Sequence, residues 1–137
     1  MAVRMTMAKG LLTLAAMTLV GSSAYHGSGY PSISKLLAES SLPGGFGLGI
    51  RALWVALSVQ FLMLAALLGV AVARPTPGVR TVVLVCGLGL AVETLVFGAI
   101  VGLFVGTVML ALASVLTLAG WAMHRGVAGN VSRQGHG

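Results

Sequence analysis

Glu93 is the residue whose type and position most favour a chemical role. It is the sole charged residue between positions 81 and 123. An ionisable side chain inside a membrane-spanning segment is a functional hypothesis by default, and its partner must be named. We expect that partner to be Arg51, because an ion pair would neutralise both charges and hold two helices together. The mid-segment amide Gln60 also needs a hydrogen-bond partner. The alternative places all three side chains around a proton- or cation-coupled substrate site.

Two histidines have side chains that can in principle ligate haem, chlorophyll or a metal ion. His26 and His124 are predicted near opposite faces of a membrane, so they cannot hold one haem between them within this chain. Neither has a cysteine, histidine or aspartate at ligand spacing. We therefore interpret both as interfacial residues, expect no metal site, and find that the sequence implies no cofactor.

Known catalytic signatures are also missing from the sequence. It has no phosphate-binding glycine loop, no HExxH motif and no serine–histidine–acid set that can be assembled. An enzyme needs a placed acid, base or nucleophile. The sequence therefore predicts a protein that is not an enzyme.

Three glycines, Gly98, Gly102 and Gly106, are spaced four residues apart. Such a pattern of small residues lets one helix backbone approach another closely. It indicates docking to a partner, packing inside a bundle, or simply a turn. Aromatic residues near the ends of apolar segments are typical anchors at the membrane–water interface, and we expect this role for Trp54, Trp121, Tyr25 and Tyr30.

The composition explains why these residues must be positioned by membrane helices. Of 137 residues, 58% are hydrophobic and 7% are charged, and the mean hydropathy is +1.05. Soluble domains are about 25% charged, so a soluble globular enzyme is excluded. A disordered chain is excluded too, since disorder requires low hydrophobicity. The net charge of +6 comes from eight lysines and arginines. Basic flanks that orient a membrane protein explain this charge better than nucleic-acid binding.

A helical span needs about 20 residues to cross the hydrocarbon layer. The apolar runs are continuous rather than alternating, so we expect helices and not barrel strands. The sequence predicts one membrane domain over residues 1–137, an all-α bundle with four transmembrane helices, and its spans are expected at about 5–25, 49–73, 81–99 and 102–123.

The first apolar segment has two alternative interpretations, and the turn between the third and fourth spans has more than one candidate position. Residues 5–25 fit either a cleaved signal peptide or a first span whose Lys9 reaches the headgroups, and we adopt the span. The turn between the third and fourth spans is expected near Phe97 to Leu103, where glycines are the best clue.

The polar stretch 26–48 is expected to be an outer loop that contains a short amphipathic helix at about 32–40. Such a helix usually lies in the interface or folds over the bundle. The glycine-rich tail 126–137 is expected to be flexible.

Orientation follows from counting the basic residues. With the N terminus inside, the inner side carries Arg4, Lys9, Arg74, Arg80, Arg125 and Arg133. The outer side carries only Lys35 and Arg51. This distribution obeys the positive-inside rule with both termini cytoplasmic. The bias towards alanine, glycine, valine and leucine fits a bacterial inner-membrane protein.

The size and four-span outline are similar to those of the small multidrug resistance transporters. Those proteins carry an essential glutamate in the first span, whereas Glu93 falls in the third predicted span. No residue role is therefore carried over from that family.

These features favour a non-catalytic accessory or structural subunit. We expect it to dock to a larger membrane complex, respiratory or photosynthetic for instance, or to form a homo-oligomer, without nucleic acid as a partner. The main alternative is a small transporter or lipophile-binding protein that uses Glu93 with Arg51 and Gln60. A weaker alternative is a membrane enzyme that acts on lipid or quinone.

Overall fold

The computed structural model describes residues 2–134, with the side chains of Pro77 and residues 124–134 left aside. Within this range the chain forms five α-helices joined by short connections, and it contains no strand. Four helical segments are long and apolar enough to cross a membrane. The predicted all-helical architecture with four such segments is therefore confirmed.

The first half of the chain is one long helical hairpin. α1 spans Ala2–Ser28, and after Gly29 the chain continues as α2, Tyr30–Ala38. Pro31 lies in the first turn of α2, where its missing N–H costs nothing. The chain turns back through residues 39–43 into α3, Gly44–Ala73. The short helix expected at about 32–40 corresponds to α2, and the rest of the region 26–48, expected to be loop, is largely taken up by the ends of α1 and α3.

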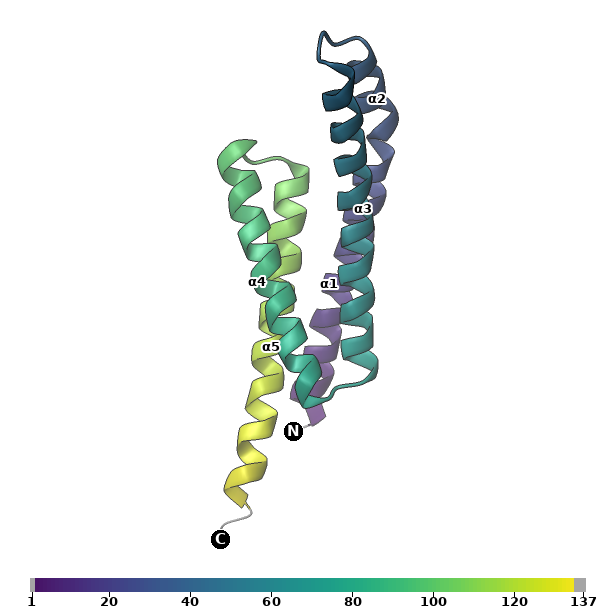
Figure 1. Cartoon of the computed structure of the whole chain (residues 1–137). Coiled ribbons are helices and arrows are strands. Elements are labelled where there is room, and N and C mark those ends of the chain that lie inside the picture. The colour runs from purple at the N-terminus through teal and green to yellow at the C-terminus, as the bar shows by residue number, and fades with distance from the viewer. Residues whose placement is uncertain (1, 135–137) are drawn as a thin grey trace.

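α2 neither folds over the bundle nor stands apart from it. It continues past the end of α1 and lies beside the first turns of α3 (Figure 1). Lys35 and Glu39 form an exposed i,i+4 ion pair at 4.0 Å. The α2–α3 end of this hairpin projects beyond the turn that joins the last two helices (Figure 1).

The second half is a shorter hairpin. α4 spans Pro77–Ile100, and α5 spans Val105–Gln134. Gly102, with φ +88°, forms the turn between them, because this left-handed conformation suits glycine. This turn and its glycine agree with the prediction from the sequence. α5 continues through most of the predicted tail, since no proline interrupts it, and residues 135–137 lie outside the described range.

Of the three interpretations that the sequence left open for Gly98, Gly102 and Gly106, the structure agrees with the turn. Gly98 lies in α4, Gly102 in the turn and Gly106 in α5, so the turn separates the three residues. Close helix approach occurs at two other glycines. A Cβ atom on Gly87 would lie 2.7 Å from Leu118 Cδ2, and one on Gly120 would lie 2.8 Å from Leu12 Cδ2.

α1 is the central element of the packing. It lies against both α3 and α5, and α5 also packs against α4. α3 and α4 are joined by a connection of only three residues, but they pack against each other over a much shorter stretch. The fold therefore consists of two helix pairs, α1–α3 and α4–α5, joined along α1 and α5 and parted between α3 and α4.

Candidate functional site

The most elaborate polar contacts in the described structure centre on His26 at the end of α1. Its ring stacks on the Trp54 indole with centroids 4.0 Å apart and planes 18° apart. The ring also makes an edge-on aromatic contact with Phe61, with centroids 6.1 Å apart. The Trp54 Nε1–H donates to the His26 carbonyl oxygen at 2.7 Å. The tryptophan thus holds both the ring and the backbone of His26.

Ser58 completes this arrangement from α3. Its Oγ lies 3.0 Å from His26 Nδ1 and 3.3 Å from the carbonyl oxygen of Trp54. The Ser58 carbonyl oxygen accepts a hydrogen bond of 2.8 Å from Ser23 Oγ on α1. In a membrane such polar contacts between helices contribute about 0.6 to 2 kcal/mol each, so this cluster fixes the register of α1 against α3.

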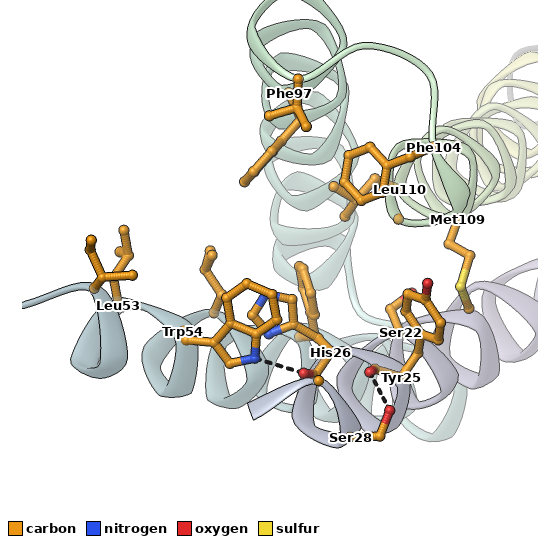
Figure 2. A pocket seen from close by; sticks show the side chains of 16 residues that line it. Ser22, Tyr25, His26, Ser28, Leu53, Trp54, Phe97, Phe104, Met109 and Leu110 are labelled. Carbon is orange, nitrogen blue, oxygen red and sulfur yellow. Dashed lines mark hydrogen bonds between the residues drawn. The ribbon is translucent and has the colours of Figure 1, made fainter. Parts of the chain in front are cut away.

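Beside this cluster a cavity of about 610 Å³ lies between the two helix pairs (Figure 2). His26 and Trp54 lie on one side, and Phe97, Phe104 and Leu110 lie on the opposite side (Figure 2). The volume falls in the range of about 300 to 1,000 Å³ that is usual for small-molecule sites. The α4–α5 turn forms one end of this space.

The lining of this cavity is almost entirely apolar. Two of its hydroxyl groups are already bonded to their own helix: Ser22 Oγ donates to the Thr18 carbonyl and Ser28 Oγ to the Tyr25 carbonyl. Polar character is therefore concentrated at the His26 ring and the Tyr25 hydroxyl. Such a lining suits an apolar molecule that carries few polar groups.

The cavity opens to the surroundings of the helices. Tyr25, Leu53 and Val101 line it and remain 53%, 61% and 61% exposed. In a bilayer this lateral opening would face lipid.

Glu93 and Gln60 meet, as the sequence suggested they could. Gln60 Nε2 on α3 donates to Glu93 Oε1 on α4. Glu93 Oε2 is buried and has no hydrogen-bond partner among the described residues. From this bridge an apolar groove of about 430 Å³ runs between α3 and α4 towards Thr81.

The predicted ion pair between Arg51 and Glu93 is wrong. Arg51 Nη2 instead donates to the Ser34 carbonyl of α2 at 3.2 Å. Arg51 precedes Gln60 by nine residues on the same helix, which is about 13 Å along the axis. Its side chain therefore serves the α2–α3 end of the hairpin, and an uncharged amide bonds to Glu93.

Of the other predicted site residues, Tyr25, His26 and Trp54 lie together at the cavity, and the rest lie elsewhere. Trp54 faces His26 inside the hairpin, and Trp121 packs against the core near the opposite end, beside Leu12 and Ala71. Tyr30 is at the start of α2. The side chain of His124 lies outside the described residues. Where side chains are described, no three of the residue types His, Cys, Asp and Glu lie together as a metal site.

Sequence reasoning singled out a few of the residues that line the cavity, Tyr25, His26, Trp54 and Gly106 among them, but not the cavity itself. His26 was assigned to the interface and Trp54 to an aromatic belt. The spacing of Trp54 and Ser58 by one helical turn was the available signal. It became meaningful only once α1 placed His26 opposite both.

Comparisons of this chain with protein families, with curated proteins and with solved structures found no match.

Proposed function

We propose that this chain is an integral membrane protein with four spans that binds an uncharged lipophile in the cavity between its helix pairs. The observation that carries the proposal is the apolar cavity of about 610 Å³ beside His26 and Trp54. A charged ligand would meet no charged side chain among the residues that line it. Desolvating an unpaired charge there would be costly.

The membrane setting belongs to the same proposal. The exposed faces carry many large apolar side chains, among them Met17, Met63, Val85, Leu95 and Val115, which are each more than 60% exposed. Hydrocarbon would cover such faces, whereas water would not. We place the protein in a bacterial inner membrane as a multi-pass protein with both termini cytoplasmic. The positive-inside count supports that orientation, and it sets α2 and the α4–α5 turn on the outer side.

A cavity-filling substitution tests ligand binding. Leu57 lines the cavity and is half-buried, whereas Val59, two residues later on α3, lies outside it and is 49% exposed. Leu57→Trp should fill part of the space, and Val59→Trp is the matched control. Bromododecane is a suitable neutral probe, since its bromine can be counted per protein chain in purified micelles after subtraction of empty micelles.

We expect saturable binding of about one bromododecane per chain in the wild type and in Val59→Trp. Leu57→Trp should bind it about tenfold more weakly, which is 1.4 kcal/mol. Binding that never exceeds empty micelles would overturn the proposal. Equal affinity in the two tryptophan variants would do so as well, because the ligand would then lie elsewhere.

The accessory-subunit hypothesis remains a separate prediction. Faces that would dock to larger subunits are the same faces that lipid would cover, so exposure alone does not favour a protein partner. Purification in mild detergent with mass spectrometry of the eluate tests it, with a stoichiometric set of larger membrane subunits as the expected result. We propose a non-catalytic role in either case.

A further inference from the structure

Aromatic side chains are concentrated at the cavity between the helix pairs. The sequence has four phenylalanines, two tryptophans and two tyrosines. Five of these eight are among the 16 residues that line the cavity. They come from three helices and the α4–α5 turn, and they are Tyr25, Trp54, Phe61, Phe97 and Phe104. Segments far apart in the sequence therefore bring their aromatic residues to one place.

A belt of interfacial aromatic residues does not explain this concentration. Such belts consist of tryptophan and tyrosine at the level of the headgroups, whereas three of the five residues here are phenylalanines. Phe61 is only 5% exposed, so it packs against other helices and not against lipid. Trp54 donates its indole N–H within the hairpin, to the His26 carbonyl oxygen. These residues therefore belong to the interior of the protein.

One wall of the cavity already contains two aromatic contacts. The His26 ring stacks on Trp54 with centroids 4.0 Å apart, and Phe61 meets the same ring edge-on at 6.1 Å and 83°. Stacked and edge-on contacts stabilise aromatic pairs beyond the burial of apolar area. Phe97 and Phe104 lie across the cavity from this wall (Figure 2). A flat ring bound between the two sides would therefore meet aromatic neighbours on both.

We infer that the cavity selects lipophiles that carry an aromatic ring over saturated lipophiles of the same skeleton. This inference rests on the proposed function and specifies its ligand class: a neutral arene whose ring lies between Trp54 on one side and Phe97 and Phe104 on the other. A saturated ring buries apolar area as well but has no π-system, so it forgoes the aromatic contacts. Two such contacts amount to about a tenfold difference in affinity.

Biphenyl and bicyclohexyl test the selection, because they share one carbon skeleton and differ in aromaticity. Each is used to displace bromododecane from the purified full-length protein, with correction for its partition into empty micelles. Biphenyl should bind about tenfold more tightly than bicyclohexyl. Phe97→Leu and Phe104→Leu should each lower this ratio to about threefold, while bromododecane still binds. Phe46→Leu is the matched control and should keep the tenfold ratio, since Phe46 lies outside this cavity and is 67% exposed.

NMR gives an independent reading of where the aromatic ligand lies. In Phe46→Leu every remaining phenylalanine lines the cavity. When this variant is deuterated except at its phenylalanine rings, bound biphenyl should show nuclear Overhauser effects to those rings. An excess of deuterated bromododecane should abolish them, because both molecules occupy one site. Absence of these effects from saturating biphenyl would overturn the inference, since its ring would lie elsewhere.

The possible failures separate the two proposals. If biphenyl and bicyclohexyl bind equally while bromododecane saturates one site, the aromatic selection is overturned and lipophile binding stands. A tenfold ratio that survives in both Phe97→Leu and Phe104→Leu also overturns the selection, because ligand shape and not aromatic contact would then set the preference. If bromododecane does not saturate, the proposed function itself fails.

Discussion

The two helix pairs are held together by different chemistry. α1 and α3 are joined by side-chain hydrogen bonds from Ser23, Trp54 and the His26–Ser58 pair. α4 and α5 are joined by close packing at Gly87, next to which Ser114 Oγ donates to the Gly87 carbonyl at 3.1 Å. One interface is polar and aromatic, and the other depends on a missing side chain.

This difference explains where the cavity lies. Bulky aromatic and polar side chains project from the α1–α3 pair into the space beside them. The α4–α5 pair buries its small residues between its own helices and presents Phe97 and Phe104 outward to the cavity. The pairs differ in what a substitution should cost, and four variants measure that difference in order of decreasing effect.

Gly87→Val should be the most damaging. The added Cβ would lie 2.7 Å and 2.9 Å from two Leu118 carbons and 3.3 Å from Thr117 Cγ2. Overpacking of this kind costs about 1 to 3 kcal/mol. Loss of helical circular dichroism on heating in detergent measures it. Gly89→Val is the control on the same helix, because nothing lies within 4 Å of its Cβ position. Equal melting temperatures would show that α4 and α5 are not closely packed at Gly87.

Trp54→Phe should cause the next largest loss of stability, about 1 to 2 kcal/mol. The His26 carbonyl loses its N–H donor, and the aromatic stack becomes smaller. Cys86 is the chain's one cysteine and is buried, so heat-induced labelling by a maleimide dye reports unfolding. Tyr30→Phe should leave that midpoint unchanged. A wild-type midpoint for Trp54→Phe would mean that polar contacts do not stabilise the α1–α3 pair.

Glu93→Ala should cost about 0.6 to 1.7 kcal/mol, since the Gln60 amide loses its partner between the two pairs. Glu93→Gln keeps an acceptor oxygen and should stay close to wild type in the same thiol assay. If glutamine were as harmful as alanine, the carboxylate charge would be required, and the amide–acid bridge would not explain this site.

Glu39→Gln should have the smallest effect, about 0.3 to 0.5 kcal/mol. Its ion pair with Lys35 is 4.0 Å long and its side chains are 78% and 64% exposed, so solvent and salt screen it. The thiol-labelling midpoint of Glu39→Gln should differ from that of the wild type by less than the midpoint of Glu93→Ala does. High salt should not enlarge this difference. A larger shift would show that α2 contributes more to the hairpin than its exposure indicates.

The helices were predictable because apolar length alone determines them. Residues 81–123 had to be two helices with a turn, and Gly102 supplied that turn. The α2–α3 end was less predictable. Its serines and glycines suggested a loop around one short helix, but Arg51 bonded to the Ser34 carbonyl helps hold α2 against α3 in a helical hairpin.

The site was less predictable than the fold because it depends on helix rotation. The sequence placed Gln60 near the middle of its segment, and Arg51 lies about 13 Å from it along α3. The axial register and the rotation of α3 together decide which of them faces α4. The amide does so, and the guanidinium does not. The same rotation brings Ser58 and Trp54 to His26, which no pattern within one segment could reveal.

The tip of the α4–α5 hairpin is apolar throughout. Ile100, Val101 and Leu103 are 79%, 61% and 89% exposed, and the turn carries no charge. In the proposed topology this tip would settle among acyl chains, below the level of the projecting α2–α3 end of the other hairpin (Figure 1). The cavity mouth then opens inside the membrane, where partitioning already concentrates a lipophile. Occupancy by the proposed lipophile would thus be governed by its content in the bilayer, and a modest intrinsic affinity would be enough to fill the site.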